Sequence, residues 1–302
     1  ERAGRGGRPA LTLDLEGHGR EPLDAATDLT RTVGWFTSVF PVHLDAGDID
    51  LTEAMAGGSD AGQALKRIKE QLRTLPHAGV GYGLLRHLDD EGRTALGGSA
   101  DPQIAFNYLG RFGRPRRAPF APADSYAAVF GGAEQDRPLD YLISLNCAVH
   151  ETPEGPRLDA TWQYAPRVID EDAIHALADA WIAALQALVC HSATPGAGGP
   201  SRSDFDLVSY DQVQIDEFAA IVPELDDIWP LTAMQAGLLF HSQRTAGQQD
   251  PYLVQLRLDL DGPLDPGRLQ RALNALVKRH PGLTARLVHD RQGRAVQLVP
   301  SQ

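Results

Sequence analysis

A stretch of small and polar residues divides this chain into two parts, each with its own pattern of strands and helices. Residues 192–204 read SATPGAGGPSRSD, a composition typical of a flexible connection between folded units. The length of 302 residues also exceeds what one hydrophobic core usually serves. We therefore expect a first domain over residues 1–191, an inter-domain linker over 192–225, and the beginning of a second domain over 226–302.

The first part mixes strand and helix patterns. Apolar alternation predicts strands and helical spacing predicts helices. The expected elements are strands at 11–17, 31–44 and 104–110, an antiparallel hairpin around the turn ETPEGP, and helices at 59–76 and 170–191. Proline lacks a backbone donor, so we expect the second strand to be bent or broken at Pro41.

The second part repeats this mixture. We expect a helix at 230–244 with Pro230 near its first turn, a strand at 252–262, a helix at 264–282, and two short strands at the end. Sheet pieces with covering helices in both parts predict an α+β layered architecture.

Composition excludes several classes of function. The net charge is −12, and the one basic run, RFGRPRR at 111–117, is too short for the broad positive face of a nucleic-acid-binding protein. Cys147 and Cys190 are too few for a disulfide framework and lack metal-ligand spacing, which suits a reducing cytoplasm. No uninterrupted apolar run approaches the roughly 20 residues that span a bilayer, so we expect no membrane contact.

The first strand ends in a carboxylate that is followed by a histidine between two glycines. In TLDLEGHGRE, Glu16 is followed by Gly17, His18 and Gly19. An isolated glutamate at a strand end is ordinarily a solvated surface acid. The alternative is a general base, because neighbouring glycines let a substrate approach closely and a cleft raises the pKa of a carboxylate. This stretch alone leaves both interpretations open.

Four phrases occur in a fixed order: EGHGRE at 16–21, RTVGWFTSVFPVHL at 31–44, PHAGVGYG at 76–83 and FNYLGRF at 106–112. With them the first part resembles the C-terminal half of an epimerization domain of a nonribosomal peptide synthetase. The resemblance implies a sandwich lobe like that of chloramphenicol acetyltransferase, which faces a second lobe across a tunnel. A peptidyl carrier protein would insert its phosphopantetheine arm into that tunnel, and the chain itself would bind no cofactor or metal.

The resemblance implies inversion of the α-carbon of an aminoacyl or peptidyl thioester from L to D. By motif match, Glu16 is the acid/base residue, and Asn107 and Tyr108 lie beside the reacting centre. The supporting residues of the same motifs are His18, Arg20 and Trp35. Trp35 and Phe36 alternate, so one of the two rings is expected inside and the other at the tunnel. For GVGYG at 79–83, a turn with positive φ is favoured over a phosphate-binding loop.

The chain departs from the family in one respect. The second catalytic group of such domains is a histidine in an HHxxxDG motif, and the ten histidines here include no adjacent pair. We therefore expect the chain to be a piece of a longer protein that does not epimerize by itself. A non-catalytic lobe that docks the carrier protein is the alternative, with arginines 111, 114, 116 and 117 as its contact or as an exposed loop.

The second part resembles the start of a condensation domain. The resemblance rests on two segments, DIWPLTAMQAGLLFHS at 227–242 and ALVKRHPGLTARLV at 275–288. The form PLTxMQxGLLFH is typical of condensation domains that follow an epimerase and accept a D-configured donor. Thr284 stands where arginine is common. The resemblance thus implies a place in an assembly line for a peptide product such as an antibiotic.

Overall fold

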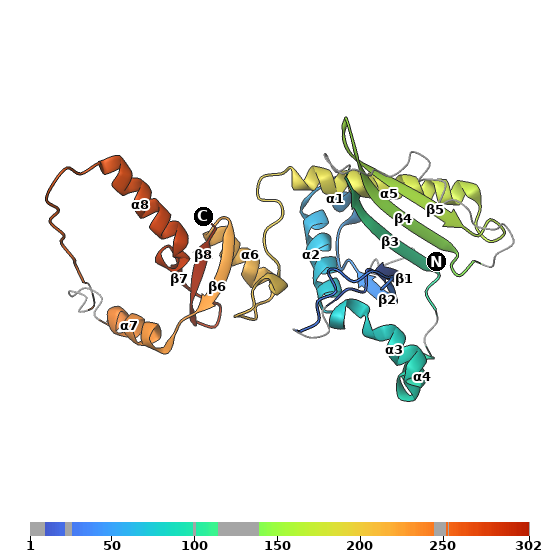
Figure 1. The fold of residues 1–302 in the computed structure, drawn as a ribbon, viewed down its shortest axis with the longest axis horizontal. Coiled ribbons are helices and arrows are strands. Elements are labelled where there is room, and N and C mark those ends of the chain that lie inside the picture. Colours follow the sequence, from blue (N-terminus) through green and yellow to red (C-terminus); the bar gives the residue numbers. More distant parts are fainter. Residues whose placement is uncertain are drawn as a thin grey trace. The chain divides into compact units, whose positions relative to one another are not determined.

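The structure is a computed structural model. It describes residues 10–21, 26–98, 101–113, 139–244, 252 and 254–301. The chain forms two compact units, Glu1–Thr194 and Pro195–Gln302, which are treated separately below as unit 1 and unit 2. Both units combine sheets with helices, which confirms the expected α+β class (Figure 1).

Unit 1 is built on a five-stranded mixed sheet of order β2-β1-β3-β4-β5. β1 pairs antiparallel with β2 and parallel with β3, β3 pairs parallel with β4, and β4 forms an antiparallel hairpin with β5. The strands are β1 (Ala10–Gly17), β2 (Ser38–Asp45), β3 (Ile104–Phe112), β4 (Ile143–Thr152) and β5 (Gly155–Tyr164). The predicted hairpin is confirmed.

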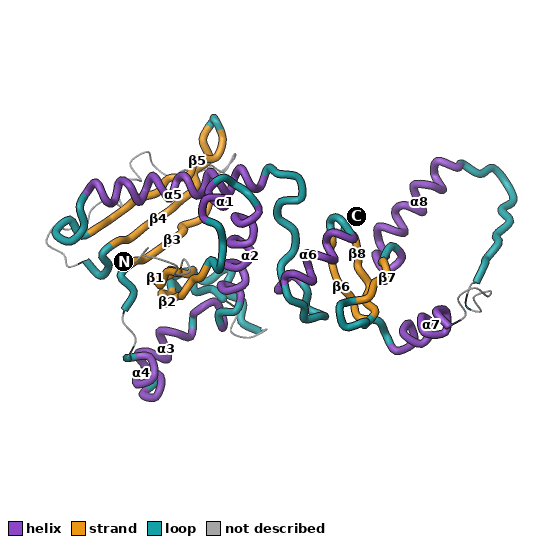
Figure 2. The backbone as a smooth tube through the Cα atoms, turned by 180° about the vertical axis from the view of Figure 1, so that it is seen from behind, coloured by secondary structure: helices purple, strands orange, loops and turns teal. Residues whose placement is uncertain are grey.

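Helices cover one face of this sheet (Figures 1 and 2). The helices of unit 1 are α1 (Leu51–Met55), α2 (Ser59–Arg73), α3 (Gly81–Leu88), α4 (Asp90–Leu96) and α5 (Glu171–Ser192), of which α4 packs against α3 and not on the sheet. Leu13, Phe40 and Val42 are buried on this face, against Leu72 at the end of α2 and Tyr82 of α3. Since side chains alternate along a strand, the polar residues between these apolar ones lie on the opposite, helix-free face. We call this the open face.

The long helix α5 is the most apolar helix of unit 1. By length and apolar composition it is sufficient to cross a bilayer, although an isolated helix of this kind is weak support, because core helices of soluble domains meet the same criterion. Here α5 contacts α1 and α2, and its Trp181 ring meets Trp162 of β5 edge to face at 6.0 Å. These contacts pack part of the helix within unit 1, and its buried residues are Ile174 and Ala187.

The second strand differs from its prediction. Residues 31–37 form a loop, and β2 begins only at Ser38. Pro41 neither bends nor breaks the strand but pairs with Asp14 inside it. The order of the sheet explains this, because β2 is an edge strand and its proline can direct the missing donor away from the ladder.

Unit 2 contains a three-stranded antiparallel sheet of order β6-β8-β7. Its elements are α6 (Gln212–Ile221), β6 (Leu225–Pro230), α7 (Ala233–Arg244), α8 (Pro266–Arg279), β7 (Arg286–His289) and β8 (Ala295–Pro300). Phe218 of α6, Ile228 of β6 and Leu298 of β8 are almost fully buried in its core. The helix expected over 264–282 and the two terminal strands are confirmed.

Three expectations about the second part are altered by the structure. The segment 205–225, expected as the more structured part of the linker, holds α6 and core residues such as Phe205. Pro230 ends β6 instead of lying in the first turn of α7. The described residues of the expected strand 252–262 form no strand, and their apolar side chains are exposed, because no neighbouring strand accepts their hydrogen bonds.

Candidate functional site

The structure places Glu16 directly beside Asn107. The two residues are Cα partners in the parallel pairing of β1 with β3. Neighbouring strands lie about 4.8 Å apart, and partners in register project to the same face. Glu16 is exposed and Asn107 is half-buried. Residues 91 positions apart in the sequence are therefore neighbours on the open face.

A polar row continues across the sheet from this pair. Asn107 is the partner of Asn146 on β4, and Asn146 is the partner of Thr161 on β5. None of these side chains is buried. These residues form one line at right angles to the strands. We call this line the polar row, and it consists of Glu16, Asn107, Asn146 and Thr161. It offers a carboxylate and two carboxamides to a ligand lying across the open face.

Tyr108 does not join this group. It follows Asn107 in β3 and is the partner of Cys147, which is buried on the helix-covered side. Side chains of consecutive strand residues point to opposite faces. Tyr108 lies in the middle of β3 and its side chain is 52% exposed. The motif match that set Tyr108 beside Asn107 at the reacting centre is therefore at odds with this placement.

The loop after Glu16 is shaped by Gly19. Its φ is +62°, in the left-handed region, and a β-carbon there would lie 1.5 Å from the Phe36 carbonyl oxygen. Only glycine allows the two backbone segments to approach this closely. The His18 ring stabilises the same turn, because its Nδ1 accepts the Arg20 amide at 3.0 Å and its Nε2 lies 3.3 Å from a Glu21 oxygen.

Arg20 fixes the segment that faces this loop. Its guanidinium donates to the carbonyl oxygens of Leu29, Thr32 and Gly34 at 2.8–3.0 Å. The same group lies over the Phe36 ring, 4.4 Å from the ring centre. Arg20 therefore holds the loop in place. This agrees with the supporting role that the motif implied for it.

The two rings of the VGWFT phrase have separate surroundings. Phe36 packs under Arg20, whereas the Trp35 side chain is 93% exposed. Trp35 contacts no aromatic ring or arginine among the described residues. Its role as a tunnel residue stays a prediction.

A tyrosine–aspartate pair lies on the open face near Glu16. Tyr141 Oη donates to Asp14 Oδ2 at 2.9 Å, and Asp14 precedes Glu16 by two residues on the same face. Burial, the hydrogen bond to Asp14, and the negative charges of Asp14, Asp140 and Glu16 raise the pKa of Tyr141 to about 12. The phenol therefore keeps its proton at neutral pH and remains a donor.

Sequence reasoning missed Asn146 and the Tyr141–Asp14 pair. The alternation in LDYLISLNCAVH was used for its apolar members, and Asn146 falls at a polar position of the same strand. Its register with Asn107 follows from strand order, which no local pattern specifies. The signal available was a second asparagine on a strand that pairs with the FNYLG strand.

Other candidate features carry less weight. Arg111 forms an ion pair with Glu151 of β4, and arginines 114, 116 and 117 lie outside the described residues.

Gly79 has a φ of +81°, as expected of a turn, and a β-carbon there would meet the Phe40 ring. Over the described ranges, no cluster of histidine, cysteine or carboxylate side chains is arranged to hold a metal ion.

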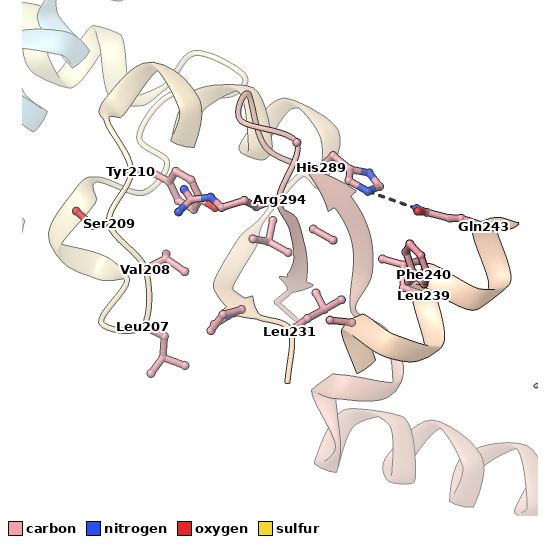
Figure 3. Close-up of a pocket in the computed structure, with 15 residues that line it drawn as sticks. Leu207, Val208, Ser209, Tyr210, Leu231, Leu239, Phe240, Gln243, His289 and Arg294 are labelled. Atoms are coloured by element: carbon pink, nitrogen blue, oxygen red, sulfur yellow. Dashed lines mark hydrogen bonds between the residues drawn. The ribbon is translucent and has the colours of Figure 1, made fainter. Parts of the chain in front are cut away.

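Unit 2 contains a pocket of about 590 Å³ between α7, the end of β6 and strand β8 (Figure 3). Its walls are mostly apolar, with Leu231 and Phe240 among them. The charged group in its wall, Arg294, already binds the buried Asp290 carboxylate at 2.8 Å. Gln243 likewise faces His289 at 3.4 Å (Figure 3). Because these polar groups are already engaged with one another, we assign no ligand to the pocket.

A sequence profile described as "Condensation domain" matches residues 7–198 and 226–302, which is most of the chain. The chain belongs to the condensation-domain family. It is a nonribosomal peptide synthetase fragment of the condensation/epimerization type, and its mixed sheet with one helix-covered face is the fold of that superfamily. The unmatched residues 199–225 fall within the segment expected as a linker.

Known relatives of this condensation-domain fragment are large synthetases. It is 36% identical over 288 residues to a linear gramicidin synthase of Brevibacillus parabrevis, covering 94% of this chain and 4% of that protein. It is 30% identical over 299 residues to a mycosubtilin synthase of Bacillus subtilis, covering 97% of this chain and 11% of that protein. The fragment therefore spans a small part of the relatives that it matches.

Among solved structures, the fragment is similar to the epimerization domain from the third module of tyrocidine synthetase B. The identity is 29%, the TM-score is 0.44, and the match covers 61% of this chain and 38% of that chain.

Proposed function

We propose that unit 1 supplies the glutamate side of an epimerase site, which inverts the α-carbon of an aminoacyl or peptidyl thioester on a carrier protein. The observation that supports the proposal is the register of Glu16 with Asn107 on the open face. A carboxylate and a carboxamide on neighbouring strands, whose backbones lie about 4.8 Å apart, can act on adjacent atoms of one substrate. The match of both residues to epimerization-domain motifs favours this reaction over amide formation.

In this mechanism the Glu16 carboxylate removes the α-proton. The electron pair of the C–H bond forms the enolate double bond, and negative charge develops on the thioester oxygen. The Asn107 amide N–H donates to that oxygen, as an oxyanion-hole donor does. A proton delivered to the opposite face of the enolate gives the D-configured thioester, and the proton held by Glu16 is returned to solvent.

The second proton must come from a group on the other side of the substrate. His43 lies on the open face as the partner of Thr12, four residues along β2 from Val39, the partner of Glu16. That is about 13 Å at the rise of a strand, and on the same side of any ligand as Glu16. An HHxxxDG histidine from another lobe would meet the requirement. We therefore propose that this chain alone does not epimerize.

The same proposal includes partners. A carrier protein would present the substrate on its phosphopantetheine arm, and unit 2 would begin a condensation domain that receives the inverted thioester. The family membership of both matched segments supports this order. Arg111 is not proposed as a contact for an acidic carrier protein, because the Glu151 carboxylate already neutralises the charge of its guanidinium.

The test is α-deuterium exchange and L-to-D conversion of a carrier-bound aminoacyl thioester by the full-length synthetase. Glu16→Gln should slow both by about 10²- to 10⁴-fold, and Asn107→Ala by about 10²-fold. Glu21→Gln, which removes a nearby carboxylate that pairs with His18, is the matched control and should retain near-normal rates.

The opposite result would favour the alternative function. If Glu16→Gln keeps the rate within about threefold while carrier binding is also unchanged, the lobe acts as a docking element without acid/base chemistry. Exchange well above background by the 302-residue chain alone would contradict the need for a second lobe.

A further inference from the structure

The Asn146 carboxamide lies on the open face, at a polar position of β4. It is half-buried, and among the residues that the structure describes it takes part in no hydrogen bond. A partly buried amide loses stability when its donors and acceptor are unmatched, unless water or a ligand satisfies them. Asn146 is therefore a polar group available to a bound molecule.

The position of Asn146 relative to the proposed chemistry is defined by the sheet. It is the partner of Asn107, which is the partner of Glu16, so the three residues occupy successive strands of the polar row. Asn146 lies about 4.8 Å beyond Asn107 and about 10 Å from Glu16. A ligand lying along the row would meet the base first, the oxyanion donor second and the second carboxamide third.

The tethered substrate has groups at matching intervals. In a pantetheine thioester, the first amide of the arm follows the thioester carbonyl carbon after one sulfur and two methylenes. With ordinary bond lengths this extended link spans about 5 Å, close to one strand spacing. With the thioester oxygen at Asn107, the arm's first amide falls at Asn146.

We propose that Asn146 binds a secondary amide of the tethered thioester, which the spacing assigns to the first amide of the pantetheine arm. This inference rests on the proposed function, because it uses Glu16 and Asn107 to place the reacting carbons. A carboxamide is suited to the task, since it can donate to an amide carbonyl and accept from an amide N–H at once. Asn146 would be a binding residue and take no part in the proton transfers.

The experiment uses the full-length synthetase with small thioesters in place of the carrier. An aminoacyl N-acetylcysteamine thioester keeps the arm's first amide, whereas the corresponding aminoacyl propyl thioester lacks it. Asn146→Ala should lower kcat/KM for the first substrate about tenfold, mainly by raising KM, and leave that for the propyl thioester within about twofold. Gln163→Ala, which removes an exposed carboxamide one row away on the same face, is the control and should change neither.

A second variant and a second substrate separate the other outcomes. Asn146→Asp keeps the size and the acceptor but removes the donors, so a loss equal to that of alanine assigns the bond to the amide N–H of Asn146. A dipeptidyl propyl thioester carries a peptide amide only; a KM increase confined to this substrate would move the bound amide to the peptide and overturn the assignment to the arm. If Asn146→Ala changes kcat/KM equally for all the thioesters, or changes it for none of them, the inference is overturned.

The proposed function and this inference can fail separately. Loss of α-deuterium exchange in Glu16→Gln with normal kinetics in Asn146→Ala would overturn only the amide contact. Normal exchange in Glu16→Gln would remove the epimerase proposal and, with it, the basis for the register argument. Thermal unfolding of Asn146→Ala within about 3 °C of the parent excludes misfolding as the cause of a change.

Discussion

The Arg20 guanidinium lies 4.4 Å from the centre of the Phe36 ring and binds the carbonyl oxygens that precede it. A planar fork with five donors is needed to combine these contacts. This arrangement ties the loop that follows Glu16 to the loop that precedes β2. The position of the Glu16 strand end thus depends on a cation that does not touch the open face.

Arg20→Lys should therefore loosen residues 29–36. Lysine offers one point charge and cannot bind three carbonyl oxygens in a plane. We expect amide hydrogen exchange in this segment to rise at least tenfold. The proposed epimerization by the full-length protein should fall about tenfold, because Glu16, the proposed base, is less well positioned. Arg31→Lys, at an exposed arginine of the same loop, is the control. Protection equal to that of the parent in Arg20→Lys would contradict this account.

Gly19→Ala should be more damaging than Gly110→Ala. Both glycines have a positive φ, but a β-carbon at Gly19 would collide with the Phe36 carbonyl, whereas Gly110 has open space around it. We expect a loss of about 1 kcal/mol at Gly110 from backbone strain, and of about 3 kcal/mol or more at Gly19 from strain and overlap together. Urea unfolding of the two variants measures the difference. Equal losses would show that φ alone decides the cost.

Tyr141 should make unit 1 sensitive to alkaline pH. Burial and the hydrogen bond to Asp14 raise its pKa to about 12, above the value near 10 expected when unfolded. The stabilisation is therefore complete below about pH 10 and is lost as the pH rises toward 12. Tyr141→Phe should be less stable than the parent by about 1 kcal/mol at pH 8, and this gap should shrink between pH 10 and 12. A gap that stays constant over that range in urea unfolding would refute the coupling.

Asp290 should stabilise unit 2 in the opposite pH range. Burial favours the protonated carboxyl, but hydrogen bonds from the Arg294 backbone and guanidinium and from Tyr210 outweigh it, and the pKa is lowered. The contribution is therefore present above about pH 4, the ordinary aspartate pKa, and is lost as the pH falls through the lower folded value.

Asp290→Asn should cost about 2 kcal/mol at pH 7 and much less near pH 2. Hydrogen exchange of the amides at 286–300 reports unit 2 specifically, and the exposed Asp226→Asn is the matched control. A loss that does not depend on pH would indicate that packing, and not the charge, explains the role of Asp290.

Local patterns were sufficient for much of the fold. The spacing of apolar residues located α2, α5 and α8, and alternation around ETPEGP located the β4–β5 hairpin. These elements depend on residues a few positions apart, so their signals lie within short windows. By resemblance, the EGHGRE and FNYLGRF phrases likewise assign Glu16 and Asn107 to one site, and the structure pairs the two residues on neighbouring strands.

The errors arise where a segment needs a distant partner. Residues 254–260 alternate as a strand should but have no strand beside them, whereas Pro41 lies within β2 because that strand is at an edge. The match to the FNYLG motif placed both Asn107 and Tyr108 beside the reacting centre, whereas consecutive residues of a strand point to opposite faces. Residues 205–218 were expected to be a more structured connector, but their place in the core of unit 2 depends on packing of α6 against β6 and β8.

The sequence by itself determined the types of most elements, the two-part organisation and the chemical groups of the site. Only the tertiary structure decided that Glu16, Asn107 and Asn146 form one row, and that Tyr108 is not part of it. The physical reason is that strand order and register depend on hydrogen bonds between residues far apart in the chain, which the local sequence does not encode.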